Sequence, residues 1–130
     1  METEQTCRPL ILVAEDDDSN FKLIKAVIGK KCEILWARNG EEILQLYREH
    51  KGKAAVILMD IMMPVMDGLE ATRILREEGA TLPIVAQTAY AFASDREKAM
   101  ANGATEVLVK PITVQALRGC VSRYVPDLVW

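Results

Sequence analysis

Five short apolar segments, each followed by a longer segment with helical periodicity, dominate this sequence. All but the second lack the polar alternation of a half-exposed strand, which is typical of strands buried on both faces. The longer segments repeat apolar residues three or four positions apart, as amphipathic helices do. We therefore predict strands at residues 10–14, 32–37, 54–59, 82–87 and 106–109.

The regular alternation of strand and helix indicates one α/β domain, with a parallel sheet between two layers of helices. Right-handed crossovers leave few strand orders, and 2-1-3-4-5 is the common one for a chain of 130 residues. We therefore expect a flavodoxin-like (βα)5 doubly wound sheet in this order. The predicted domain covers residues 10–125, with tails at residues 1–9 and 126–130.

The composition argues against several classes of function. The formal net charge is −3 and there is no basic stripe, so direct binding of nucleic acid is not expected. No apolar run approaches the roughly 20 residues of a membrane-spanning helix, so we expect no membrane insertion. Cys7, Cys32 and Cys120 lack the paired spacing of a metal or redox site, which predicts free thiols in the cytoplasm.

Carboxylates follow the first and third predicted strands. Glu15 and Asp16 follow the first strand, and Asp60 follows the third. In the order 2-1-3-4-5 these strands are neighbours, so the three side chains meet at the carboxyl edge of the sheet. Their mutual repulsion favours raised pKa values or a bound cation, and an all-oxygen cluster of this kind suits Mg²⁺.

Two further polar residues arrive at the same edge. Thr88 follows the fourth strand and Lys110 follows the fifth. A carboxylate held beside Mg²⁺ and a lysine can attack a phosphoryl group, while a hydroxyl and an ammonium can bind its oxygens. An aspartate at a strand end is also a common turn cap, so the hypothesis that Asp60 is a nucleophile depends on the whole arrangement.

Four segments together resemble the receiver domains of two-component response regulators. They occur in the order and spacing of that family and extend over nearly the whole chain. The acidic pair Glu15 and Asp16 more closely resembles the receivers attached to hybrid sensor histidine kinases. The four segments are residues 12–16 (LVAED), 59–68 (MDIMMPVMDG), 87–89 (QTA) and 103–111 (GATEVLVKP).

The resemblance implies a phosphoacceptor and a Mg²⁺ site. Asp60 is similar to the aspartate that takes a phosphoryl group from a histidine. Asp16 resembles a direct Mg²⁺ ligand and Glu15 a ligand that acts through water. The backbone carbonyl of Met62 matches a further ligand.

The resemblance also implies how the phosphoryl group is sensed. Thr88 resembles the hydroxyl that turns toward it, Lys110 resembles the ammonium that pairs with it, and the peptide bond before Pro111 is expected to be cis. Many receivers carry an inward-swinging aromatic residue three positions before the lysine, where this chain has Val107. The signal is therefore expected to pass through shifts of the neighbouring loop and the fourth helix.

A receiver would be a signalling domain and not an enzyme, catalysing only its own phosphorylation and slow autodephosphorylation. The expected phosphodonor is a histidine kinase or a histidine phosphotransfer domain. The expected output surface is the face formed by the fourth helix, the fifth strand and the fifth helix, on which two copies could also pair.

Three other functions remain as alternatives. A Mg²⁺-dependent phosphohydrolase of small molecules would usually carry a second aspartate where this chain has Met62. A nucleotide- or flavin-binding module would need a phosphate-binding loop after the first strand, where residues 15–18 are all acidic. A receiver-shaped adaptor that is never phosphorylated is disfavoured, because no site residue is missing.

Overall fold

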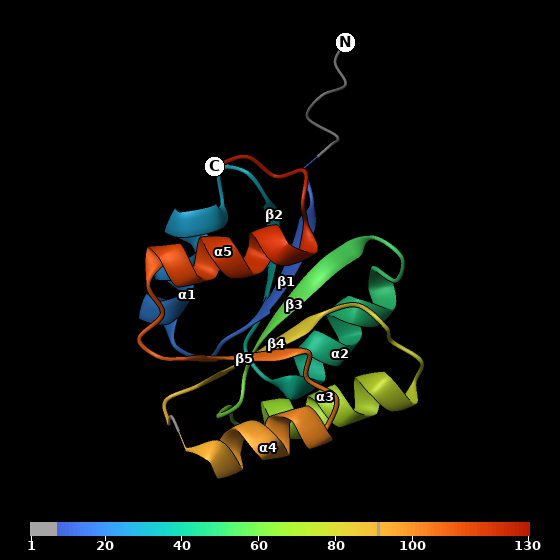
Figure 1. Cartoon of the computed structure of the whole chain (residues 1–130). Helices are drawn as coiled ribbons and strands as arrows, with labels where there is room; N and C mark the ends of the chain where they lie inside the picture. Colours follow the sequence, from blue (N-terminus) through green and yellow to red (C-terminus); the bar gives the residue numbers. More distant parts are fainter. Residues whose placement is uncertain (1–7, 91) are drawn as a thin grey trace.

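The computed structural model describes residues 8–90 and 92–130, and a five-stranded parallel sheet forms its centre (Figure 1). The strand order is β2-β1-β3-β4-β5, which confirms the prediction. The second predicted strand is an edge strand. The strands are β1 (Leu10–Ala14), β2 (Glu33–Ala37), β3 (Ala54–Asp60), β4 (Ile84–Thr88) and β5 (Glu106–Val109).

Helices cover both faces of this sheet. Helices α1 and α5 pack on one face, and α2 and α3 pack on the other, with α4 beside α3 next to β5 (Figure 1). The strands and helices alternate along the whole described chain, as the sequence pattern predicts. The helices are α1 (Asp18–Ile28), α2 (Gly40–Glu49), α3 (Gly68–Glu77), α4 (Ala93–Ala101) and α5 (Val114–Tyr124).

Three apolar clusters of the described residues hold these layers together, and the two larger ones share β1. In β1, Ile11 and Val13 face α1 and α5, whereas Leu10 and Leu12 face α2 and α3. Every residue of β1 is buried, because both faces of this strand are covered. In the described part of the chain, no helix is long and apolar enough to cross a membrane.

The start of α4 differs from the sequence prediction. Residues 94–97 (SDRE) form a capping-box pattern, which predicts Ser94 as the N-cap of this helix. In the structure α4 begins at Ala93, and Phe92 occupies the N-cap without a side-chain hydrogen bond. The Phe92 carbonyl accepts from Asp95 N (3.1 Å), so Ser94 already lies in the first turn. The capping-box prediction was therefore wrong by about two residues.

The structure describes the two ends of the chain to different extents. Residues 1–7 of the predicted N-terminal tail, with Cys7, lie outside the described residues. At the other end, Leu128 and Trp130 pack against the α1–α5 cluster, and the Trp130 indole donates to Ser122 Oγ (2.7 Å). The C-terminal segment is therefore held against α5.

Candidate functional site

The carboxyl ends of β1 and β3 bring the three predicted carboxylates together. Ala14 pairs with Met59 across these strands, so Glu15 and Asp16 follow beside Asp60. One carboxylate oxygen from each residue lies within 4.8 Å of the others. The neighbouring strand ends therefore form an acidic cluster, as the strand order predicts.

Asp60 is the buried member at the centre of this cluster, with 3% of its surface exposed. Its Oδ2 lies 3.1 Å from Lys110 Nζ, and its Oδ1 accepts a hydrogen bond from Met62 N (3.3 Å). Burial and the neighbouring Glu15 raise the pKa of Asp60 to about 6, against the opposing effect of the Lys110 ammonium.

Glu15 is fully buried and is held by groups that the sequence analysis did not identify. Its Oε1 accepts from Asn20 Nδ2 (2.6 Å) and lies 3.6 Å from Lys110 Nζ, and its Oε2 accepts from Asp17 N (3.2 Å). Asn20 is the third residue of α1 and lies in its first turn. The Asn20 side chain reaches Glu15 because of the direction in which α1 leaves β1.

Asp16 is the exposed member of the cluster. Partial burial and the charge of Asp60 raise its pKa. The three carboxylates supply hard oxygen ligands close together, and the exposed position of Asp16 leaves water access to the cluster. This donor set fits Mg²⁺, which prefers few carboxylates and keeps several waters.

Thr88 and Lys110 reach the same edge from β4 and β5. Their backbones are joined there, because Lys110 N donates to the Thr88 carbonyl (2.7 Å). The Thr88 hydroxyl accepts from Tyr90 N (3.1 Å), so it is bound to the β4–α4 loop, whereas the Lys110 ammonium contacts Asp60 and Glu15. The peptide bond between Lys110 and Pro111 is cis.

The loop after Asp60 returns closely against the strand end. Gly68, the first residue of α3, donates its N–H to the Ile61 carbonyl (2.8 Å). A Cβ atom at Gly68 would lie 2.1 Å from the Asp60 carbonyl oxygen. Asp67 caps α3 by accepting from Glu70 N (2.8 Å). Glycine is therefore required for α3 to start directly behind Asp60.

A second residue that the sequence analysis missed lies directly beside Asp60. Gln87 pairs with Asp60 across β3 and β4 and is fully buried. Among the described residues, neither polar atom of its side chain has a hydrogen-bond partner. A glutamine inside an apolar strand segment was a signal available in the sequence.

Comparisons with known proteins agree with this architecture. A family model described as the response regulator receiver domain matches residues 11–122. Hybrid signal transduction histidine kinase I of Dictyostelium discoideum is 43% identical over 115 residues, which cover 82% of this chain and 7% of that protein. Polar-differentiation response regulator DivK of Brucella anthropi is 34% identical over 120 residues, which cover 90% of this chain and 96% of that protein.

A solved structure from Saccharomyces cerevisiae contains a histidine phosphotransfer signaling protein with the receiver domain of its downstream response regulator. The match has a TM-score of 0.84 and 28% identity, and it covers 90% of this chain and 88% of that chain. The present chain thus spans a small part of the hybrid kinase and nearly all of the bacterial regulator. The chain belongs to the response regulator receiver domain family, whose members are the signalling domains of two-component and phosphorelay systems.

Proposed function

We propose that Asp60 accepts a phosphoryl group from a phosphohistidine. An Asp60 carboxylate oxygen attacks phosphorus, the bond between phosphorus and the histidine nitrogen breaks, and its electron pair remains on the imidazole. The observation that carries this proposal is the Lys110 ammonium 3.1 Å from a buried Asp60 carboxylate that also adjoins two further acids. Such a site can bind phosphoryl oxygens and a cation together.

In this proposal Glu15, Asp16, Asp60 and the Met62 carbonyl hold Mg²⁺. When bound, the ion supplies positive charge that offsets the repulsion between the acids and the phosphoryl group. Asn20 keeps the Glu15 carboxylate facing the cluster through its 2.6 Å hydrogen bond.

Lys110 and Thr88 would bind the transferred group. The Lys110 ammonium already lies between Asp60 and Glu15, so a short movement brings it to a phosphoryl oxygen. The Thr88 hydroxyl accepts from Tyr90 N, and its own O–H would donate to a phosphoryl oxygen. Thr88 would therefore link the phosphoryl group to the β4–α4 loop. Val107, in the place of a swinging aromatic residue, is buried beside Ala99 of α4 and would transmit the change by packing.

The phosphodonor in this proposal is a histidine kinase or a histidine phosphotransfer domain, and the reaction takes place in the cytoplasm. The yeast complex supports this choice, because it contains a phosphotransfer protein together with a receiver of the same fold. The receiver would cover residues 10–125, a range that the family match over residues 11–122 supports. Its only catalysis would be of its own phosphorylation and slow dephosphorylation.

The output surface in this proposal is the face of α4, β5 and α5, through which two copies would also pair. Large apolar side chains are exposed over this part of the described chain, which supports a contact surface. Sedimentation velocity with and without acetyl phosphate tests the pairing, and an unchanged monomer would contradict it. These exposed side chains are Tyr90, Phe92, Met100, Val109 and Val114.

Intact mass spectrometry after incubation with acetyl phosphate tests the acceptor. We expect one phosphoryl adduct that requires Mg²⁺ and is lost in Asp60→Asn. Asp127→Asn is the matched control, because Asp127 is an exposed acid near the C-terminus. If the folded native protein gains no adduct, the acceptor role is wrong. An adduct that persists in Asp60→Asn would assign the acceptor to another residue.

A further inference from the structure

Gln87 is a buried polar residue that the proposed chemistry does not yet use. Its side chain is fully buried in β4, and neither its amide nitrogen nor its oxygen has a hydrogen-bond partner among the described residues. The other buried residues of this strand before Thr88 are Ile84, Val85 and Ala86. Because an unpaired buried amide is costly, an apolar residue would be more stable at this position.

The strand register places this amide beside the acceptor. Gln87 pairs with Asp60 across the parallel strands β3 and β4. The side chains of these two residues therefore point to the same face, about 5 Å apart, the spacing of neighbouring strands. Val85 and Leu58, two residues before each, both belong to the α1–α5 cluster. Gln87 and Asp60 therefore lie next to each other on the α1–α5 face of the sheet.

The strand register also places Lys110 near Gln87, two residues beyond the β5 residue that pairs with it. Leu108 of β5 pairs with Gln87 and packs against the α1–α5 cluster. Lys110 follows two residues later on the same side, and its ammonium reaches Asp60 at 3.1 Å. The Gln87 side chain thus lies on the same face and at the same edge of the sheet as both members of the Asp60–Lys110 ion pair.

A carboxamide has the right groups to serve both members, because its nitrogen donates and its oxygen accepts. In the structure the two Asp60 oxygens already bind Lys110 Nζ and Met62 N. Phosphorylation converts one Asp60 oxygen into the bridge to phosphorus and leaves the other as a carbonyl oxygen. It also attracts the Lys110 ammonium to the phosphoryl oxygens. The Asp60 side chain and the Lys110 ammonium therefore both change partners.

We propose that Gln87 is a positioning residue of the acceptor site, and this inference rests on the proposed function. In the phosphorylated protein its Nε2 donates to the remaining Asp60 carbonyl oxygen and its Oε1 accepts from the Lys110 ammonium. The amide is unpaired before phosphorylation and paired afterwards. Gln87 therefore destabilises the unphosphorylated state and favours the phosphorylated one.

The test uses the whole chain and beryllofluoride, which mimics a phosphoryl group on a carboxylate. Gln87→Met keeps the length of the side chain and removes its hydrogen-bonding groups. We expect this variant to melt at a higher temperature and to bind beryllofluoride with Mg²⁺ about thirtyfold more weakly, the effect of losing two hydrogen bonds. Gln87→Asn, whose amide is one methylene shorter, should show the same loss of affinity.

A spectroscopic signature separates this role from a merely structural one. In the native protein we expect the Gln87 side-chain NH₂ resonances to shift when beryllofluoride binds. Ile84→Val is the control, because Ile84 lies in the same strand but faces α2 and α3. It should lower stability without changing beryllofluoride affinity.

Two results would overturn the proposal. Unchanged beryllofluoride affinity in Gln87→Met, or in Gln87→Asn if the first variant does not fold, would show that the amide does not serve the site. Unshifted Gln87 NH₂ resonances would show the same in the native protein. These results leave the proposed function intact if the native protein binds beryllofluoride or takes a phosphoryl group from acetyl phosphate. If the native protein does neither, the proposed function itself is wrong.

Discussion

Helices α3 and α4 lie on the same side of the sheet, but they are attached to it very differently (Figure 1). Asp67 caps α3 with its side chain, and α3 buries Gly68, Ala71, Thr72 and Leu75. The N-cap of α4 is Phe92, which makes no side-chain hydrogen bond, and α4 buries Ala99 alone.

This difference suits a switch, in which one part of the fold stays in place and another part moves. The α3 side holds the loop behind Asp60, where a displacement would disturb the proposed acceptor. The α4 side follows Thr88 and has few buried contacts, so little free energy is needed to shift it. The fold thus combines a firmly held proposed acceptor with a weakly held helix beside the proposed output surface. The following predictions test this comparison, from the largest expected effect to the smallest.

Gly68→Ala should disrupt the close packing of the start of α3 against the Asp60 backbone. Its Cβ would overlap the Asp60 carbonyl oxygen, which is backbone and cannot move aside easily. We expect the free energy of unfolding to fall by about 3 kcal/mol or more. Urea denaturation followed by circular dichroism measures this change.

Gly119→Ala is the matched control for that substitution. Gly119 is exposed within α5, and a Cβ there meets only Arg123 Nη1 at 3.9 Å. Alanine should therefore raise the free energy of unfolding by up to about 1 kcal/mol. Equal losses in the two variants would contradict the close contact between α3 and the Asp60 backbone.

Buffer pH should change stability through Asp60 when divalent cations are removed by a chelator. The pKa of Asp60 is about 6 in the folded protein, above its ordinary value of 3.8. The folded state therefore holds this proton more tightly, and stability falls as pH rises from about 4 to about 6. The loss attributable to Asp60 should approach about 3 kcal/mol.

The measurement for this pH effect is the difference between native protein and Asp60→Asn in urea denaturation at several pH values. The difference should be smallest near pH 4 and largest at pH 7, with the variant more stable at pH 7. A difference that does not depend on pH would show that burial does not raise the pKa of Asp60.

Arg76→Met should weaken the attachment of the C-terminal end of α3 to the rest of the fold. The Arg76 guanidinium donates to the carbonyls of Gly103 (2.8 Å), Ala80 (2.9 Å) and Leu82 (2.8 Å) and to Thr105 Oγ1 (3.2 Å). Methionine keeps much of the apolar stem but leaves these carbonyls without their donor. We expect a loss of about 2 kcal/mol in thermal or urea denaturation.

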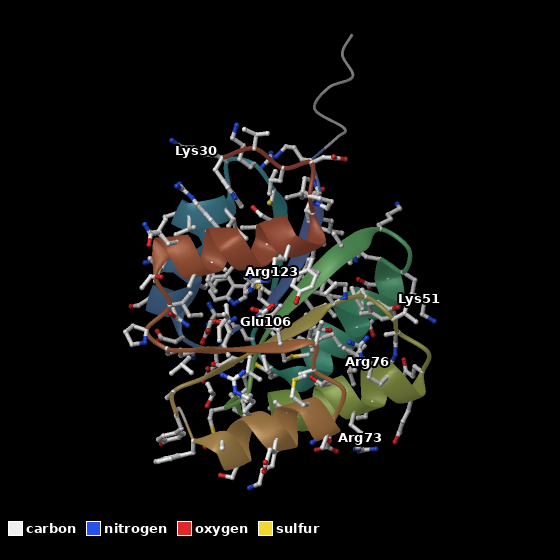
Figure 2. All side chains as sticks on the ribbon, in the orientation of Figure 1. Lys30, Lys51, Arg73, Arg76, Glu106 and Arg123 are labelled. Carbon is white, nitrogen blue, oxygen red and sulfur yellow. The ribbon has the colours of Figure 1, made fainter. Side chains whose placement is uncertain are left out.

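Arg73→Met provides the control on the same helix. Figure 2 shows Arg73 and Arg76 both on α3. Within the described ranges, Arg73 forms ion pairs only with the exposed acids Glu70 and Glu77. Its replacement should cost less than about 0.5 kcal/mol. If the two arginine variants lose equal stability, the proposed anchoring by Arg76 is wrong.

Phe92→Ser should reduce the contrast between the two helices by giving α4 a side-chain cap. Phe92 is 66% exposed, so removal of its ring costs little. We expect α4 to gain about 1 kcal/mol relative to Phe92→Ala, which removes the ring without capping. Slower amide hydrogen exchange in α4 checks this, and equal exchange in the two variants would contradict it.

Much of the fold could be predicted because local patterns and topology agree. The continuous apolar run of β1 predicts a strand buried on both faces, and the partial alternation of β2 fits its place at the edge. The start of α4 was predicted less well. A capping box at Ser94 is a local signal, and the path of the chain from β4 through Phe92 decided where the first turn closes.

The candidate site was predictable to the extent that it lies at strand ends. Glu15 and Lys110 each follow a strand and Asp60 is the last residue of one, and parallel strands bring their ends to one edge. Asn20 and Gln87 were not identified. Asn20 reaches Glu15 because of the angle at which α1 leaves β1, and Gln87 lies beside Asp60 because of the β3–β4 register.

The sequence by itself determined the order of elements, the strand ends that carry polar residues and hence the family. These depend on residues close together in the chain, whose periodicity and turn preferences are local. Only the tertiary structure decided which buried groups touch, such as Lys110 with Asp60 and Asn20 with Glu15. It also decided that α3 is firmly anchored and α4 weakly. Contacts between distant segments depend on register and packing, and local patterns do not specify either.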